Sequence, residues 1–438
     1  MNTKGLDLWK KSLQIIPGGN GLLSKRPERY APDIWPTYFK SSKGVEVTDI
    51  DDNLYIDMAQ MGIGSAILGY ANEELNEAVI RSINLGVNCT LNSFEEYELA
   101  SKLIELNPFA GAVRFAKTGG EAMSIAVRIA RAASNKSKVL FSGYHGWSDW
   151  YLSANIKNAK NLNNHLLDGL KTNGVPKGLI NTSIPFNYDD LDDFEEKINQ
   201  HKDIGVICIE GARGKMPSTK FLEKINQYAR EKDIIIICDE ITSGWRLTDG
   251  GVYKLNNLKP DIVVYAKAMG GGFPISAVIG TKEVMDKSQD TFISSTMFTE
   301  RTGFVAALKT IEILKRVKGW EHLNKIGTII GKGWLESAEK YNLKLNVSEL
   351  KPLISFKLNY ENLNNHLITY FTQEMLKFGY LASSSVYVSL AHSESIIEEY
   401  LDKVDIVFKK IAIAIEKNNI KECLNTRVRS DSFQRLTK

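Results

Sequence analysis

The sequence contains little cysteine and no long hydrophobic run. Its 438 residues include four cysteines, Cys89, Cys208, Cys238 and Cys423, whose spacing matches neither a disulfide framework nor a metal site. We therefore expect plain thiols, a reducing cytoplasmic location and no bound metal ion. No apolar stretch approaches the roughly 20 residues that are needed to span a bilayer, so no membrane partner is expected.

The sequence also has no large excess of positive or negative charge. The formal net charge is +3 at neutral pH, and the basic excess consists of scattered residues. Since no basic block with interleaved aromatic residues occurs, nucleic-acid binding is not expected. Leu6, Trp9, Leu13 and Ile16 have helical spacing ahead of a Pro-Gly-Gly turn, which predicts an amphipathic helix at the N-terminus rather than a secretion signal.

Short apolar runs alternate with helical patterns through the middle of the chain. Several of these runs are apolar on both faces, as expected for a parallel sheet that helices cover on each side. The expected strands are residues 112–115, 138–142, 205–210, 234–238 and 261–266. The alternation predicts an α/β fold whose large domain contains a doubly wound, mostly parallel sheet.

The two ends of the chain show a different pattern and are expected to form a smaller α+β domain. Helical patterns at residues 302–317 and 394–417 flank a strand-like segment at residues 353–358. The expected boundaries assign residues 56–311 to the large domain. They assign residues 312–438 to the small domain, which residues 1–55 complete.

One lysine at the end of an expected strand points to covalent chemistry. Lys267 ends an apolar run and is followed by Ala-Met-Gly-Gly-Gly-Phe-Pro. Partial desolvation lowers the pKa of such an amine and makes it nucleophilic. Those properties suit a Schiff base with a carbonyl compound or with pyridoxal phosphate. A lysine just past a strand end is more often simply solvated, so the rest of the chain must decide.

Three other strand ends carry groups that fit the same chemistry. Thr118, Gly119 and Gly120 precede a helix, where free backbone N–H groups and the helix dipole can cradle a phosphate. The loop at residues 143–147, Gly-Tyr-His-Gly-Trp, offers a flat ring that can stack on a flat cofactor. Asp239 follows a very apolar strand, and a protonated pyridine nitrogen would be a partner for its carboxylate.

Each of these features also has an ordinary structural explanation. The glycine turn can be a helix start, the aromatic loop can pack on the sheet, and Asp239 can cap a helix. Ligands bind outside the carboxyl ends of the strands in open parallel sheets, which is where all four features fall. Together they form the set that a pyridoxal phosphate enzyme needs, and this combination reverses the ordinary interpretation of Lys267.

With these motifs the chain resembles the class III aminotransferases of pyridoxal phosphate fold type I, in particular their glutamate-1-semialdehyde 2,1-aminomutase branch. The resemblance runs almost from end to end. The shared motifs lie at residues 16–19, 118–122, 144–146, 239–246, 267–274 and 388–393.

The resemblance implies roles for individual residues. Lys267 would form the Schiff base with the cofactor and then move the proton between substrate and cofactor. Asp239 would pair with the pyridine nitrogen. The other implied cofactor contacts are Thr118, Gly119, Gly120, Tyr144 and Thr242. In this family a threonine of the neighbouring subunit completes the phosphate site; Thr296 matches it, which implies a homodimer with shared active sites.

The chain departs from the family where substrate is held. Leu22 and Lys25 stand where the aminomutase has a serine and an arginine that grip a carboxylate. The usual Glu-Pro-Val reads Glu210-Gly-Ala-Arg213, and the Gly-Asn-Pro after the threonine is replaced by a segment that ends in Arg301. The late Arg-Gly motif of many omega-aminotransferases is absent.

These changes predict retained cofactor chemistry with an altered substrate. The residues that we expect to meet an anionic group, or else to be ordinary surface charges, are Lys25, Arg26, Arg213 and Lys215. Glu210 and Arg301 are further candidates for contact with the substrate. The first hypothesis is an aminotransferase that moves an amino group from an amino-acid donor to an aldehyde or keto acceptor through pyridoxamine phosphate. An oxidised or keto sugar derivative is one candidate acceptor.

Two other hypotheses are kept beside this one. The first is an intramolecular 2,1-aminomutase of the glutamate-1-semialdehyde type. The second is a binding or regulatory protein that retains only the fold. The last hypothesis predicts a damaged cofactor site, and the sequence shows no such damage.

Overall fold

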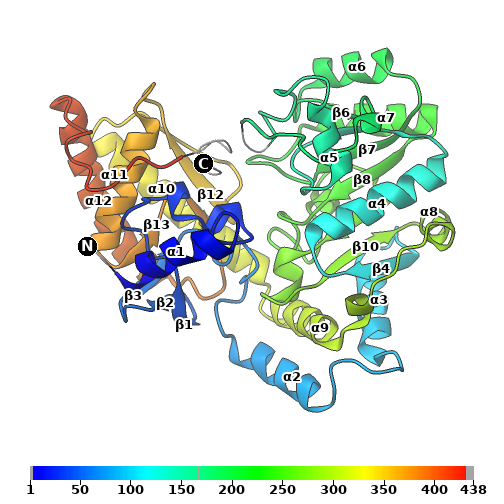
Figure 1. Cartoon of the computed structure of the whole chain (residues 1–438), viewed down its shortest axis with the longest axis horizontal. Helices are drawn as coiled ribbons and strands as arrows, with labels where there is room; N and C mark the ends of the chain where they lie inside the picture. The colour runs from blue at the N-terminus through cyan, green and yellow to red at the C-terminus, as the bar shows by residue number, and fades with distance from the viewer. Residues whose placement is uncertain (1–2, 166–167, 431–438) are drawn as a thin grey trace. The chain divides into compact units, whose positions relative to one another are not determined.

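The computed structural model describes residues 3–165 and 168–430, and the chain divides into two compact units (Figure 1). Unit 1 comprises Met1–Asn72 and Glu321–Lys438, and unit 2 comprises Glu73–Trp320. The units therefore divide after residues 72 and 320, whereas the expected boundaries were after residues 55 and 311. No helix of the described residues is long and apolar enough to cross a bilayer.

Unit 2 contains a seven-stranded sheet with the order β4-β10-β9-β8-β7-β5-β6. Only β10 runs antiparallel to its neighbours, while the pairs from β9 to β6 are all parallel. This sheet confirms the prediction of a large, mostly parallel α/β fold. The strands are β4 (Ala112–Ala116), β5 (Lys138–Ser142), β6 (Ser183–Pro185), β7 (Ile204–Glu210), β8 (Ile235–Asp239), β9 (Ile262–Tyr265) and β10 (Ser276–Gly280).

The central strands are buried because their residues are apolar on both faces. In β7 every residue except Glu210 is buried, and in β8 the residues from Ile236 to Asp239 are buried. The helices of unit 2 are α2 (Glu73–Asn84), α3 (Phe94–Leu106), α4 (Gly119–Ser134), α5 (Asp149–Leu152), α6 (Leu191–Gln200), α7 (Thr219–Lys232), α8 (Lys282–Asp286) and α9 (Arg301–Arg316). Helix α4 packs across β4 and β7 to β10.

Unit 1 joins the two ends of the chain in one sheet. Its four-stranded sheet has the order β1-β2-β3-β13, and β13 pairs in parallel with β3 although the two are more than 300 residues apart. The strands are β1 (Phe39–Lys43), β2 (Glu46–Asp49), β3 (Leu54–Met58) and β13 (Tyr380–Ala382); a second sheet contains β11 (Leu345–Val347), β12 (Leu353–Leu358) and β14 (Ser385–Tyr387). The smaller domain built from both termini is thus confirmed.

Long helices cover these sheets around an aromatic core. They are α1 (Lys4–Ile15), α10 (Gly319–Lys340), α11 (Asn364–Lys377) and α12 (Glu394–Glu416). Phe356 of β12 lies at the centre of the core, with its ring centroid 4.9 Å from Trp334, 5.3 Å from Phe371 and 5.8 Å from Phe408. One residue from each of three helices therefore packs on one strand.

Helix α10 approaches the backbone before β12 so closely that only glycine fits. A Cβ atom at Gly327 would lie 1.9 Å from the carbonyl oxygen of Lys351, whereas a Cβ at Gly331 would meet only side-chain atoms of Ile354 and Val347, at 3.3 Å. We expect Gly327→Ala to destabilise the protein by about 1–3 kcal/mol through overpacking. Gly331→Ala should be neutral or stabilising by up to about 1 kcal/mol, because alanine favours the helix.

Urea denaturation of both variants measures this contrast. Similar changes in the free energy of unfolding for the two variants would show that the close approach at Gly327 does not exist.

Candidate active site

Adjacent carboxyl ends of the central strands bring three charged residues together. Glu210 ends β7 and Asp239 ends β8, and these two residues are directly paired in the sheet. Lys267 follows β9 by two residues, and Asp239 pairs with Val264 of that strand. The parallel register therefore sets the carboxylates and the amine at one edge of the sheet, as the sequence predicted from the strand ends.

The amine of Lys267 is held by a threonine hydroxyl. Its Nζ lies 2.6 Å from Oγ1 of Thr242, in the loop after β8. Lys267 has a φ of +39°, in a region that residues other than glycine rarely adopt, and such strain concentrates at functional sites. Burial lowers the pKa of Lys267; Arg246 lowers it further, while Asp239 and Glu210 oppose the shift.

The Asp239 carboxylate is held by a buried histidine that the sequence analysis did not assign. Oδ2 lies 2.8 Å from Nδ1 of His145, and Oδ1 accepts from the backbone N–H of Ile241 at 2.9 Å. The other ring nitrogen of His145 lies 3.1 Å from the carbonyl oxygen of Ser142. His145 belongs to the same loop as Tyr144, so its position after a strand was the available signal.

The charges around His145 also affect its pKa. Burial disfavours a charged imidazole, but Cys208 and Asp239 outweigh that effect and hold the pKa of His145 well above its ordinary value. Burial raises the pKa of the Cys208 thiol, and His145 opposes that shift. The contact between Nδ1 of His145 and Oδ2 therefore orients Asp239.

The start of α4 forms a cradle of free backbone donors. Within residues 3–165 and 168–430, no acceptor pairs with the N–H groups of Gly119 and Gly120. A Cβ at Gly146 would lie 2.9 Å from the Cα of Gly120, so two glycine segments approach each other closely there. The Thr118 hydroxyl is already engaged, since it accepts from the N–H of Glu121 at 3.4 Å and donates to Oε2 of that residue at 3.1 Å.

Two other expected cofactor residues, Tyr144 and Thr296, differ in their burial. The ring of Tyr144 is partly buried and makes an edge contact with Tyr151, at 5.7 Å between centroids. Burial raises the pKa of Tyr144. Thr296 begins the short 3-10 helix η8 (Thr296–Thr299) and is exposed.

The expected substrate cations of unit 2 each have a carboxylate partner. Arg213 pairs with Glu210 at 2.5 Å and also donates to the carbonyl oxygen of His165. Lys215 pairs with Asp189, and Arg301 forms a bidentate pair with Glu95, with its shortest contact at 2.6 Å. An anionic ligand would have to displace these carboxylates.

The two expected cations of unit 1 lie in different environments. Arg26 is buried, and a Cβ at Gly18 would collide with its guanidinium. Lys25 lines a pocket formed by residues of unit 1. Within the described ranges, no cluster of three or more His, Cys, Asp or Glu side chains is arranged to hold a metal ion.

A family model described as "Aminotransferase class-III" matches residues 30–405. The chain belongs to the class III aminotransferase family. It is 32% identical over 421 residues to a 3-aminobutyryl-CoA aminotransferase of Cloacimonas acidaminovorans, covering 92% of this chain and 97% of that protein. It is 29% identical to a glutamate-1-semialdehyde 2,1-aminomutase of Sulfurisphaera tokodaii, covering 92% of this chain and 99% of that protein.

Solved structures show the same fold. The FumI protein of Sphingopyxis sp. MTA144, solved in its pyridoxal phosphate internal aldimine form, superposes with a TM-score of 0.86 at 21% identity, covering 98% of this chain and 99% of that one. An omega-transaminase from Sphaerobacter thermophilus gives a TM-score of 0.83 at 22% identity, covering 94% and 98%. The expected resemblance and fold type I architecture are thereby confirmed.

Class III aminotransferases use pyridoxal phosphate, which is therefore the cofactor of this enzyme. The residues present fit that group. Free N–H groups at the start of a 16-residue helix suit a phosphate, a buried carboxylate suits a ring nitrogen, and a desolvated amine suits an aldehyde. The close approach to Gly120 leaves no room for a side chain at Gly146.

The lowered pKa of Lys267 can be measured in cofactor-free protein. Because burial disfavours the charged amine, Lys267 should react with an acylating reagent at lower pH than exposed lysines, whose pKa is near 10.5. Stability should correspondingly rise with pH between the lowered pKa and 10.5, as the buried charge is lost. Asp239→Asn should lower the pKa of Lys267 further, since the carboxylate favours the ammonium form.

Mass spectrometry of the labelled peptide at a series of pH values gives the midpoint, with exposed lysines of the same chain as reference. A midpoint that rises in Asp239→Asn would contradict the coupling between the two residues.

Proposed function

We propose that this enzyme transfers an amino group from an amino-acid donor to an aldehyde or keto acceptor. One observation carries the proposal: the desolvated amine of Lys267 lies at the end of β9, beside Asp239 at the end of β8. The bound cofactor supplies an electron sink and carries the amino group between donor and acceptor.

Lys267 is proposed to attach the cofactor and to move the proton at the substrate carbon. Thr242 orients the free amine through its hydroxyl, as their 2.6 Å contact suggests. Asp239, held by His145, keeps a negative charge for the ring nitrogen of the cofactor. Tyr144 is proposed to stack on the cofactor ring. The backbone N–H groups of Gly119 and Gly120 are proposed to bind the cofactor phosphate, with Thr118 beside them.

The second candidate reaction is intramolecular isomerisation, because several relatives are named glutamate-1-semialdehyde 2,1-aminomutase. Transfer between two molecules is favoured for two reasons. Leu22 and Lys25 replace the residues with which the aminomutase is expected to grip its carboxylate. The relative at 32% identity is named an aminotransferase, and its name gives 3-aminobutyryl-CoA as substrate, which makes acyl-CoA amines a class to test beside keto sugars.

Arg213 is proposed to face the substrate at the strand edge. Its guanidinium pairs with Glu210, and the backbone N–H of Tyr144 lies 3.4 Å from the same carboxylate oxygen. Arg213 is therefore tied to the loop that is assigned to the cofactor ring. Its side chain is 31% exposed, so a ligand can reach it and exchange for Glu210.

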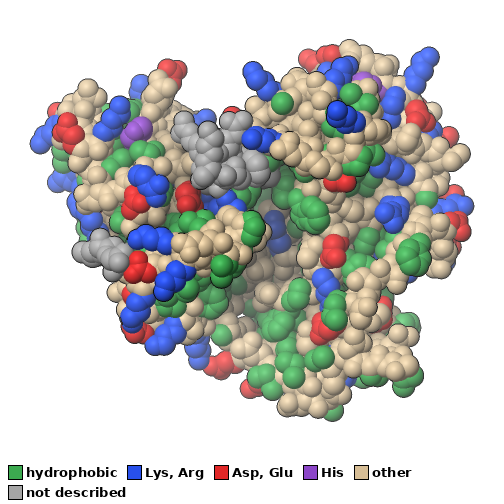
Figure 2. Space-filling model, viewed as in Figure 1, with side chains coloured by type: hydrophobic (Ala, Val, Ile, Leu, Met, Phe, Trp, Pro, Cys, Tyr) green, Lys and Arg blue, Asp and Glu red, His purple; other side chains and the backbone are tan. Residues whose placement is uncertain are grey.

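A homodimer with shared active sites is also proposed, in the cytoplasm. Exposed apolar side chains gather along α2, the segment that leads into α3 and the first turn of α3, and Figure 2 shows hydrophobic side chains on that surface. They are Ile80, Ile83, Leu85, Leu91, Phe94 and Tyr97, with exposures from 51% to 79%. A patch of this kind marks an interaction surface.

All four cysteines are free, which agrees with a reducing compartment.

Removal of the amine tests the proposed chemistry. The holoenzyme should absorb visible light as a Schiff base that borohydride bleaches, and amino donors should change this absorbance. Lys267→Ala should abolish the borohydride-sensitive band and lower transfer activity by about a thousandfold or more. Lys282→Ala removes an exposed lysine that pairs with nearby Asp286, so it is the matched control and should behave as wild type.

A donor panel separates the two reactions. Amino acids should convert the enzyme in the absence of any acceptor, and acyl-CoA, keto-acid and keto-sugar acceptors should restore the original spectrum. If no donor changes the spectrum while a diamino compound is isomerised, the aminomutase reading replaces this one.

Subunit mixing tests the shared site. Thr296→Val should weaken phosphate binding by about tenfold or more, the usual loss for a hydrogen bond to a charged group. If Thr296 serves the partner subunit, a heterodimer of Thr296→Val with Lys267→Ala has one intact site, because the second chain supplies the threonine. Mixing the two variants, with reversible dissociation, should then restore activity. Activity equal to the average of the separate variants would contradict a shared site.

A further inference from the structure

A pocket of about 260 Å³ lies on the four-stranded sheet of unit 1. Val47 of β2 pairs with Tyr55 of β3, and because side chains alternate along a strand, Asp49 and Asp57 share their face. Leu381 of β13 pairs with Asp57 and joins the same surface. This face forms the floor, and all lining residues belong to unit 1.

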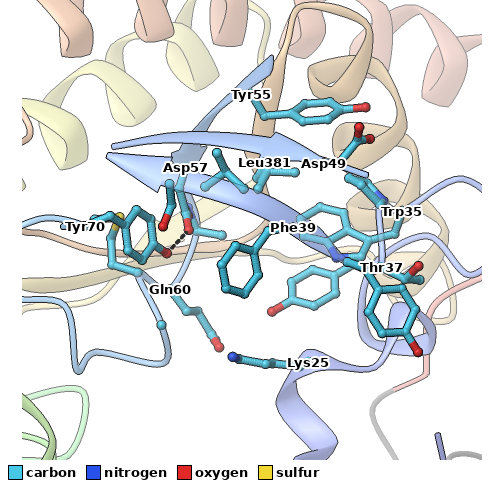
Figure 3. A pocket seen from close by; sticks show the side chains of 18 of the residues that line it. Lys25, Trp35, Thr37, Phe39, Asp49, Tyr55, Asp57, Gln60, Tyr70 and Leu381 are labelled. Atoms are coloured by element: carbon cyan, nitrogen blue, oxygen red, sulfur yellow. Dashed lines mark hydrogen bonds between the residues drawn. The ribbon is translucent and has the colours of Figure 1, made fainter. Parts of the chain in front are cut away.

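Aromatic rings form much of the wall (Figure 3). Tyr30 and Trp35 stack with centroids 4.0 Å apart and planes within 8° of parallel. Tyr38, Phe39 and Tyr70 also line the pocket. Tyr30 and Trp35 are almost fully buried, whereas Phe39 is 64% exposed and marks the open side. Aromatic faces carry partial negative charge, so they attract cations.

Two buried carboxyl groups lie on the floor of the pocket. Asp57 is 7% exposed; it accepts from Tyr70 Oη at 2.6 Å, and from the N–H of Ala59 at 2.8 Å. Asp49 is 6% exposed and accepts from the N–H groups of Asp51 and Asn53. Across the described parts of the chain, neither carboxylate forms an ion pair with a lysine or arginine.

The one lysine of the lining does not neutralise Asp57. In Figure 3 the end of Lys25 points to Gln60, and the ring of Phe39 is drawn between Lys25 and Asp57. Burial raises the pKa of Asp57, while the Tyr70 hydroxyl and the N–H groups of Ala59 and Met61 oppose the shift. A buried carboxylate with neutral partners is a costly arrangement, which a cation in the pocket would relieve.

We propose that this pocket binds a small organic ammonium ion, with Asp57 as its counter-ion and the aromatic rings as its walls. Such sites combine an apolar cavity with few polar groups that fix the ligand, and this pocket has that composition. None of the residues assigned to the cofactor lines it, although Lys25, one of the expected substrate residues, does. The ammonium group can belong to a substrate that carries a second amine, or to a separate effector.

Choline is the probe, because its quaternary nitrogen cannot form a Schiff base and therefore cannot report on Lys267. Its neutral isostere, 3,3-dimethylbutan-1-ol, has the same shape without the charge. In calorimetric titrations of the holoenzyme we expect choline to bind at least about tenfold more tightly than the isostere, from the charge and the ring faces. Equal affinities, or no binding of choline, would overturn the proposal.

Isosteric variants locate the site. Asp57→Asn should weaken choline binding about tenfold or more, whereas binding of the isostere should hardly change. Asp52→Asn is the matched control: it removes one charge from unit 1 at an exposed residue that pairs with Lys40, and its φ of +65° also suits asparagine. If Asp57→Asn does not fold, Phe39→Leu removes an exposed ring and should weaken choline binding several-fold.

Kinetics distinguish the two sources of the ammonium group. Competition between choline and the amino donor assigns the pocket to the substrate, and choline binding without any change in the KM of the donor assigns it to an effector. Unchanged choline affinity in both Asp57→Asn and Phe39→Leu would place the cation elsewhere and refute the assignment.

Discussion

Strands β7, β8 and β9 can lie side by side in the interior only because nearly all their residues are apolar. Polar side chains are therefore accommodated only where these strands end. Glu210, Asp239 and Lys267 occupy those ends, and the parallel register sets them at one edge. The low polarity of the sheet then acts on the amine, whose pKa falls because its charge is poorly solvated. The chemistry of the site therefore derives from the same apolar strands that hold unit 2 together.

Neighbouring residues orient the charged groups of this site. His145 holds Asp239, and Thr242 holds Lys267, each through a short contact from a loop that follows a strand. Gly146, in the loop of His145, closely approaches the backbone of Gly120 in the first turn of α4. Such support is what fixes a reactive group within the narrow geometry that catalysis requires.

Charge is distributed differently in the two units. The cations near the strand edge of unit 2, such as Arg213 and Arg301, already have carboxylate partners. The pocket in unit 1 has the opposite composition, since Asp49 and Asp57 are satisfied by neutral donors. Ligand recognition in unit 2 would thus require exchange of a carboxylate, whereas the two carboxyl groups of the unit 1 pocket have no lysine or arginine partner among the described residues.

The sequence by itself determined the α/β class and the family, and it predicted a set of cofactor residues, because glycine turns, apolar strands and strand-end polar residues are local patterns. It did not show β6, which is short and ends in Pro185, or β10, which directly follows the glycine loop. Only the tertiary structure showed that His145 contacts Asp239, that Arg213 and Arg301 are paired, and that β13 lies beside β3. These contacts join residues that are up to several hundred positions apart, and their distances depend on packing that no local pattern records.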